Sequence, residues 1–104
     1  MILVTGAQGF IGSFLVEYLL AAGSRIRILT RGGSRRLHTT TGQVDVWQGN
    51  LTVANTISGI ADGIDTVFHL AGEVRNAQKV TSVNLHGTMN LLAECQSSGV
   101  RRFL

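Results

Sequence analysis

Three glycines follow the first apolar run of this chain at intervals of three residues, and they constrain its fold more than any other feature. The chain opens MILVTGAQGFIG, which places Gly6, Gly9 and Gly12 directly after residues 1–5. A strand, a tight turn and a helix start in immediate succession leave backbone N–H groups free at the positive end of the helix dipole, where they attract a phosphate. The first glycine would make the turn, the second would let a pyrophosphate approach the backbone, and the third would let the helix pack closely. The opening therefore predicts a dinucleotide site, and the alternative is a glycine turn that only saves space.

The rest of the chain alternates short apolar runs with helix-periodic stretches, which is typical of a parallel sheet with helices on its faces. Strands are expected at residues 1–5, 26–30, 44–48 and 66–70, with a fifth beginning near residue 102. Helices are expected at residues 10–22, 53–60 and 79–98, with a loop over residues 32–42. The first helix is expected to bury a stripe of Ile11, Phe14, Leu15, Tyr18 and Leu19, and the last helix a stripe of Val80, Val83, Gly87, Leu91 and Cys95.

The 104 residues suffice for one domain, and they stop as the fifth strand begins. We therefore expect residues 1–104 to be the N-terminal portion of a longer protein whose substrate-binding lobe is absent here. Hydrophobic residues make up 44% of the chain and charged residues 14%, which favours a folded domain over disorder. A single cysteine, Cys95, allows no internal disulfide, so a reducing, cytoplasmic location is expected.

The net charge of +3 comes mainly from arginines, which gather in two places. These clusters contain Arg25, Arg27, Arg31, Arg35 and Arg36, and Arg101 and Arg102. Local clusters favour a small anion as partner. A nucleic-acid site would need a basic stripe with exposed aromatic residues, which we do not find, and no apolar stretch is long enough to predict a membrane span.

Several motifs in order resemble one family. TGAQGFIG at the glycine turn, GNL at residues 49–51, DTVFHLAG at residues 65–72 and VNLHGTMNLLAECQSSGVRRFL at residues 83–104 are similar to the motifs of the extended short-chain dehydrogenases/reductases, the NAD-dependent epimerase/dehydratase family. The resemblance covers essentially the whole chain. It implies a Rossmann-type, doubly wound parallel α/β sheet, here partial because the chain stops at the fifth strand.

The resemblance also implies a set of cofactor-binding residues. The glycine-turn residues would line the pyrophosphate: Gly6, Gln8, Gly9, Phe10, Ile11 and Gly12. Asn50 and Leu51 would border the adenine; Leu70, Ala71 and Gly72 would pass under the ribose; and Asn84 would lie near the cofactor or the floor of the active site. Asn50 stands where the family has Asp, and Gly72 stands where it has a second Ala.

The choice between NAD and NADP depends on the end of the second strand. An NAD site usually carries Asp or Glu about 20 residues beyond the glycine turn, and an Arg there accommodates the 2′-phosphate of NADP. No acidic residue occurs between Glu17 and Asp45, and Arg31 ends the strand. We therefore expect NADP to be preferred over NAD, with a solvated arginine loop as the alternative.

No catalytic residue is expected in the chain. The family uses a Tyr with a Lys four residues later, whereas the only tyrosine, Tyr18, is followed at that spacing by Ala22 and is expected in the core or at its edge. The three histidines share no metal-ligand spacing, His69 is expected to be structural, and Cys95 is expected to be a buried thiol. Glu73 and Arg75 follow the fourth strand, where they would face a substrate.

Two functions remain open at this point. The first is the cofactor-binding part of an NAD(P)-dependent oxidoreductase, epimerase or dehydratase that acts on a small molecule by hydride transfer. The alternative is a non-catalytic NADP-binding sensor of related fold. A fragment without ligand is a third possibility, and the resemblance makes a homodimer of the whole protein plausible. Sugar nucleotides, dihydroflavonol-like ketones and steroids all stay open as substrates.

Overall fold

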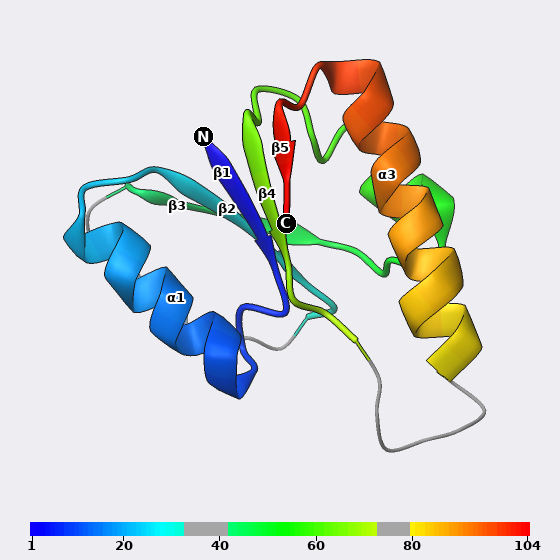
Figure 1. Cartoon of the computed structure of the whole chain (residues 1–104), viewed down its shortest axis with the longest axis horizontal. Coiled ribbons are helices and arrows are strands. Elements are labelled where there is room, and N and C mark those ends of the chain that lie inside the picture. The colour runs from blue at the N-terminus through cyan, green and yellow to red at the C-terminus, as the bar shows by residue number, and fades with distance from the viewer. Residues whose placement is uncertain (33–41, 73–79) are drawn as a thin grey trace.

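The chain forms one parallel sheet with helices on both faces, as expected for a doubly wound α/β fold (Figure 1). We describe a computed structural model that covers residues 1–32, 42–72 and 80–104, without the side chains of residues 81–83. The strands are β1 (Ile2–Thr5), β2 (Ile26–Thr30), β3 (Val44–Gln48), β4 (Thr66–His69) and β5 (Arg102–Phe103). Their order in the sheet is β3-β2-β1-β4-β5, with every neighbouring pair parallel.

The helices follow the predicted order with different lengths. They are α1 (Phe10–Ala21), a 3-10 helix η1 (Ala54–Ile57), a π-helical segment η2 (Thr81–His86) and α3 (Gly87–Ser98). The helix expected over residues 53–60 is thus only a short 3-10 turn, and the long helix changes from π to α geometry at Gly87. Gly99 ends α3 in the left-handed conformation, at φ 75°, as expected for a glycine cap. The loop expected over residues 32–42 lies almost wholly outside the described residues.

Two apolar clusters fill the two sides of the sheet. Successive residues of a strand point to opposite faces, so Leu3 joins one cluster and Val4 the other. The larger cluster lies between the sheet and α3, where Leu91 and Cys95 are buried. The smaller one lies between the sheet and α1. Figure 1 shows the resulting three layers, with α1 and α3 on opposite sides of the strands.

The buried face of α1 differs from the predicted stripe. Leu19 is buried as predicted and Leu15 packs against the smaller cluster, but the other buried residues are Gly12 and Val16. Ile11, Phe14 and Tyr18 are exposed. The expectation that Tyr18 lies in the core or at its edge was therefore wrong, since 72% of it is accessible. In the last helix, Gly87, Leu91 and Cys95 are buried as predicted, but Val80 is exposed and the side chain of Val83 is not described.

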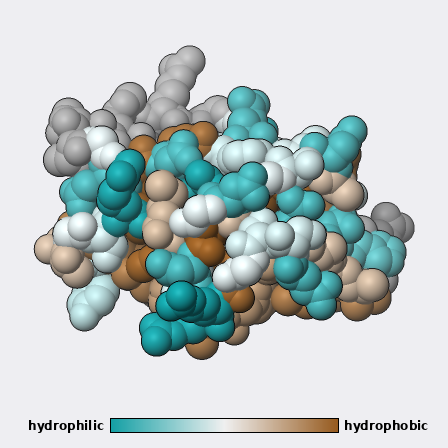
Figure 2. Space-filling model, turned by 90° about the horizontal axis from the view of Figure 1, so that it is seen from above, coloured by the Kyte–Doolittle hydropathy of each residue, from teal (hydrophilic) through white to brown (hydrophobic). Residues whose placement is uncertain are grey.

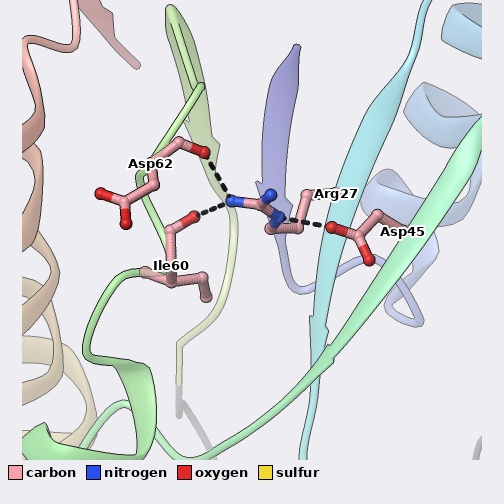
Figure 3. A network of polar contacts seen from close by, with 4 residues as sticks. All are labelled: Arg27, Asp45, Ile60 and Asp62. Carbon is pink, nitrogen blue, oxygen red and sulfur yellow. Dashed lines mark hydrogen bonds and ion pairs between the residues drawn. The ribbon is translucent and has the colours of Figure 1, made fainter.

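Arg27 links the middle of the sheet to the segment before β4 (Figure 3). Its Nη1 donates to the carbonyls of Ile60 at 2.6 Å and Asp62 at 2.9 Å, and its Nε donates to Asp45 at 2.7 Å. Its guanidinium also lies 5.5 Å from the ring centre of Trp47. These three hydrogen bonds are made within the fold, so Arg27, a member of the first arginine cluster, has a structural role.

The face at the amino ends of the strands carries mainly hydrophilic and weakly polar residues, with hydrophobic areas in between (Figure 2). Among the described residues, no helix is both long and apolar enough to cross a membrane.

Candidate functional site

The turn between β1 and α1 requires glycine at its first position on two grounds. Gly6 adopts the left-handed region, with φ 72°. A Cβ atom there would also lie 2.7 Å from the backbone nitrogen of Ala71, on the β4 side. The turn closes through a hydrogen bond from the N–H of Gly9 to the carbonyl of Gly6, at 3.0 Å. Glycine is therefore required at this position both for its positive φ and because a side chain would collide with the backbone of Ala71.

The N-terminus of α1 is left open to a ligand. Gly9 is the N-cap residue with extended backbone, no side chain caps the helix, and its first turn holds no acidic residue. The first N–H groups of a helix have no carbonyl partner within it, and the helix dipole makes this end positive. The turn can therefore receive an anionic group without competition from a capping carboxylate.

Gly12 permits the close approach of α1 to this turn. A Cβ atom at Gly12 would lie 2.0 Å from the carbonyl oxygen of Gly6 and 2.8 Å from its carbonyl carbon. Both atoms belong to the backbone, so no rotation of a side chain could relieve the contact. Gly12 is buried and does not line the cavity, so its role is in packing.

A cavity of about 330 Å³ opens at the carboxyl ends of β1, β2, β3 and β4. This volume lies in the usual range for small-molecule sites. Its walls are the glycine turn, the end of β2, the loop after β3 and the end of β4. The lining residues are Gly6, Ala7, Gln8, Gly9, Leu29, Thr30, Arg31, Gly49, Asn50, Leu51, Thr52, Leu70, Ala71 and Gly72.

Most of the predicted site residues meet in this cavity, although they come from four separate stretches of sequence. Those present are Gly6, Gln8, Gly9, Arg31, Asn50, Leu51, Leu70, Ala71 and Gly72. Phe10 and Ile11 do not line it, and their side chains are 81% and 68% exposed. Asn84 is also absent from the lining, but its Oδ1 lies 3.2 Å from the point where a Cβ of Gly72 would stand, next to the rim.

Sequence reasoning missed Ala7, Leu29, Thr30, Gly49 and Thr52 as lining residues. Four of them adjoin a predicted residue, and Leu29 lies two residues before Arg31, so the available signal was position near the carboxyl end of a strand. Arg35, Arg36, Glu73 and Arg75, which the sequence analysis also singled out, lie outside the described residues.

The loop after β3 is fixed by hydrogen bonds around Asn50. Its backbone N–H donates to the hydroxyl of Thr56 at 2.8 Å, and that hydroxyl faces the carbonyl of Asn50 at 2.9 Å. The indole N–H of Trp47 donates to the carbonyl of Thr56, also at 2.9 Å. The side-chain Oδ1 of Asn50 accepts from both the N–H and the hydroxyl of Thr52, at 3.0 and 2.8 Å. This wall of the cavity is therefore held in one geometry before any ligand binds.

The wall at the end of β4 is held by Thr5 and His69. The hydroxyl of Thr5 lies 2.7 Å from Nδ1 of His69 and accepts from the N–H of Ala71 at 3.2 Å. The other ring nitrogen of His69 lies 2.8 Å from the hydroxyl of Thr88 in α3. Burial lowers the pKa of His69. As predicted, His69 is a satisfied structural histidine, and here it joins β1, β4 and α3.

Among the described residues that line this cavity, Arg31 is the only one with an ionisable side chain. Cys95 is buried on α3, and burial raises the pKa of its thiol, so it is not poised as a nucleophile. The described residues contain no cluster of three His, Cys, Asp or Glu residues that would hold a metal ion. The arrangement can bind an anionic, elongated ligand.

Comparison with known proteins agrees with this geometry. The model of the NAD dependent epimerase/dehydratase family matches residues 2–104. The chain is 40% identical to the 3 beta-hydroxysteroid dehydrogenase/Delta 5-->4-isomerase of Mycobacterium tuberculosis, over 99% of this chain and 30% of that protein. It is 33% identical to the 3-beta-hydroxysteroid dehydrogenase of Mycolicibacterium neoaurum, with the same coverage.

Solved structures give the same result. The UDP-glucose 4-epimerase of Thermus thermophilus in complex with NAD superposes with a TM-score of 0.82 at 30% identity, over 98% of this chain and 35% of that one. The chain thus spans about 30% of the length of the curated relatives that it matches.

Proposed function

The chain belongs to the NAD-dependent epimerase/dehydratase family, and from this membership we propose that its cavity binds the ADP portion of a nicotinamide dinucleotide. The observation that carries the proposal is the cavity itself, which joins an uncapped helix N-terminus to the ends of four parallel strands. In open α/β sheets, dinucleotides bind in the crevice at this edge, with the pyrophosphate at the first helix. The proposed contacts are the backbone of residues 6–9, the segment 50–51 and the segment 70–72, with Arg31 and Asn84 at the rim.

Calorimetric titration of the purified protein with NAD and NADP tests this proposal. Gly9→Ala is the informative variant, because its Cβ would lie 3.3 Å from the carbonyl oxygen of Gly6, a contact that the turn can absorb by a few tenths of an ångström. The added methyl group would stand where the pyrophosphate must approach. We expect weaker binding with little loss of stability, whereas Ser97→Ala on the exposed face of α3 should bind as the wild type does. Absence of binding by the wild-type protein would refute the proposal.

NADP preference is part of the proposal and depends on Arg31. This residue is exposed at the cavity, and no Asp or Glu is among the lining residues to hold the ribose 2′-OH. A guanidinium can bind a 2′-phosphate through two parallel hydrogen bonds. Arg31→Ala should weaken NADP binding and leave NAD binding nearly unchanged. Equal affinity of the wild-type protein for the two cofactors would contradict this preference.

For the whole protein, we propose an oxidoreductase whose catalytic Tyr and Lys lie outside the 104 residues. The names of the two curated relatives support a 3β-hydroxysteroid as substrate, with hydride passing from the alcohol carbon to the nicotinamide and the hydroxyl proton to the enzyme base. The whole protein should form reduced cofactor from a 3β-hydroxysteroid and not from a UDP-sugar. Cofactor binding without turnover of either class would favour the sensor.

Self-association and a cytoplasmic location are further parts of the proposal. Leu85, Met89 and Leu92 expose apolar surface along η2 and α3, which supports a homodimer through this helix. Sedimentation equilibrium of the whole protein tests it, and Met89→Lys should shift the equilibrium toward monomer. The single Cys95, which allows no internal disulfide, supports a reducing compartment.

A further inference from the structure

We propose that Asn50 recognises the purine of the bound dinucleotide as a hydrogen-bond donor only, so that the site does not select for the 6-amino group of adenine. This inference rests on the proposed function, because it assumes a dinucleotide in the cavity.

The strand order places the purine beside Asn50. The pyrophosphate belongs at the glycine turn after β1, and in such sheets the adenosine ribose lies at the end of the second strand. In this chain β3 lies beyond β2 on the same side of β1. A base attached to that ribose therefore extends toward the loop after β3, where Asn50 and Thr52 line the cavity.

The orientation of the Asn50 amide follows from its partner. The backbone N–H of Thr52 can only donate, and it lies 3.0 Å from the side-chain atom assigned as Oδ1. The hydroxyl of Thr52 lies 2.8 Å from the same atom. A flipped amide would bring its NH₂ group against the peptide N–H of Thr52 and lose that bond, so the N–H fixes the orientation. Oδ1 is therefore engaged, and within the described residues Nδ2 makes no hydrogen bond, which leaves its two N–H groups for a ligand.

The backbone of Asn50 resists rearrangement that would turn the amide around. Its N–H is bonded to the hydroxyl of Thr56, whose carbonyl is held by the indole of Trp47. Gly49, just before it, has no room for a side chain, because a Cβ would lie 2.7 Å from the carbonyl oxygen of Thr56. The donor is thus preset by the fold.

This polarity has a chemical consequence for recognition of the base. Adenine presents an acceptor at N7 and donors at its 6-amino group, and an Asn reads both only when its Oδ1 and Nδ2 are both available. With Oδ1 held by Thr52, Asn50 can donate to a ring nitrogen but cannot accept from the amino group. A 6-oxopurine presents acceptors at both O6 and N7 and matches the NH₂ group of Asn50 better.

The test compares NAD with nicotinamide hypoxanthine dinucleotide, in which the 6-amino group is replaced by a carbonyl. Dissociation constants are measured by calorimetry for the wild-type protein, for Asn50→Asp and for Gln96→Glu. The last variant makes the same amide-to-carboxylate change on the exposed face of α3. We expect the wild-type protein and Gln96→Glu to bind the hypoxanthine dinucleotide at least as tightly as NAD. Asn50→Asp can still accept from Thr52, and its second oxygen accepts from an amino group, so it should favour NAD by about tenfold.

The outcomes separate this inference from the proposed function. If the wild-type protein binds NAD tenfold or more tightly than the hypoxanthine dinucleotide, Asn50 is not a donor-only contact and the inference is wrong, while the proposed function stands. The same holds if Asn50→Asp remains folded by circular dichroism and leaves the ratio of the two dissociation constants unchanged. If the wild-type protein binds neither dinucleotide, the proposed function fails and this inference fails with it.

Discussion

Replacement of Gly12 by alanine should destabilise the fold although alanine is the better helix former. The new Cβ would lie 2.0 Å from the carbonyl oxygen of Gly6, whereas such contacts are essentially never shorter than 3.0 Å. Helix α1 and the turn would have to separate by about 1 Å, the difference between these distances. A gap of that size removes about a quarter to a half of the dispersion energy of each contact across it. The inward residues Val16 and Leu19 would lose contact with the sheet.

The magnitude follows from two opposing effects. Overpacking a close-packed site costs about 1–3 kcal/mol, and a clash with fixed backbone belongs at the upper end. Replacing glycine with alanine within a helix stabilises the helix by about 1 kcal/mol. We expect Gly12→Ala to lower the free energy of unfolding by about 2 kcal/mol. Gly87→Ala is the matched control, because its Cβ would lie 3.1 Å from the Cβ of Leu51 and 3.9 Å from two further atoms of that residue. It should change stability by less than about 1 kcal/mol.

Urea denaturation followed by the fluorescence of Trp47 measures both variants. Trp47 is the only tryptophan, and it packs against the larger apolar cluster. Linear extrapolation gives the free energy of unfolding from the midpoint and slope of each curve. The reasoning is refuted if Gly12→Ala is as stable as the wild type, or if Gly87→Ala is equally damaging.

Three further changes test the packing and the electrostatics of the fold. Burial lowers the pKa of His69, so as pH falls the unfolded chain takes up a proton at this residue before the folded chain does. The contribution of His69 to stability should be complete above the ordinary histidine pKa and should be lost as pH falls through the lower pKa of the folded state. Urea midpoints measured from about pH 8 to about pH 5 should show this slope for the wild type and not for His69→Gln. Arg27→Met should lower the free energy of unfolding by about 2 kcal/mol, because two backbone carbonyls lose their donor while Asp45 remains half exposed. A urea midpoint equal to that of the wild type would contradict the linking role of Arg27. Leu91→Ala should lower the free energy of unfolding by about 2–5 kcal/mol, since Leu91 is fully buried. Leu92→Ala, on the exposed side of α3, should lower it much less. Equal losses for the two variants in urea denaturation would show that the buried face of α3 is misassigned.

Local patterns predicted the parts of the fold that depend on local chemistry. The strand runs and the glycine turn came from short stretches whose burial and backbone geometry are set by the residues themselves. Gly6 needs a positive φ, and Gly12 needs space, and both requirements are visible in the sequence spacing. The segments that line the cavity could also be predicted from the sequence, because the carboxyl ends of parallel strands meet at one edge of the sheet.

The orientation of α1 could not be read from its hydrophobic period alone. Apolar residues occur on more than one side of this helix, so Ile11, Phe14 and Tyr18 form a stripe that competes with the one containing Val16. Gly12 decides between the two stripes, because the face of α1 that packs against the glycine turn must carry a glycine at the point of contact. The same glycine that predicted close packing therefore fixed which stripe is buried, and the two sequence predictions were inconsistent with each other.

The polarity of Asn50 is a different kind of failure, because no pattern of residue types contains it. An asparagine carries both a donor and an acceptor, and its sequence position says only that it stands at the end of β3. Which of the two faces the ligand depends on the N–H and hydroxyl of Thr52, two residues away, and on a loop held by Thr56 and Trp47. An aspartate in the same loop would present an acceptor and an asparagine a donor, although both satisfy Thr52. A one-atom difference in the side chain thus reverses the hydrogen-bonding character of the wall while leaving the fold that supports it unchanged.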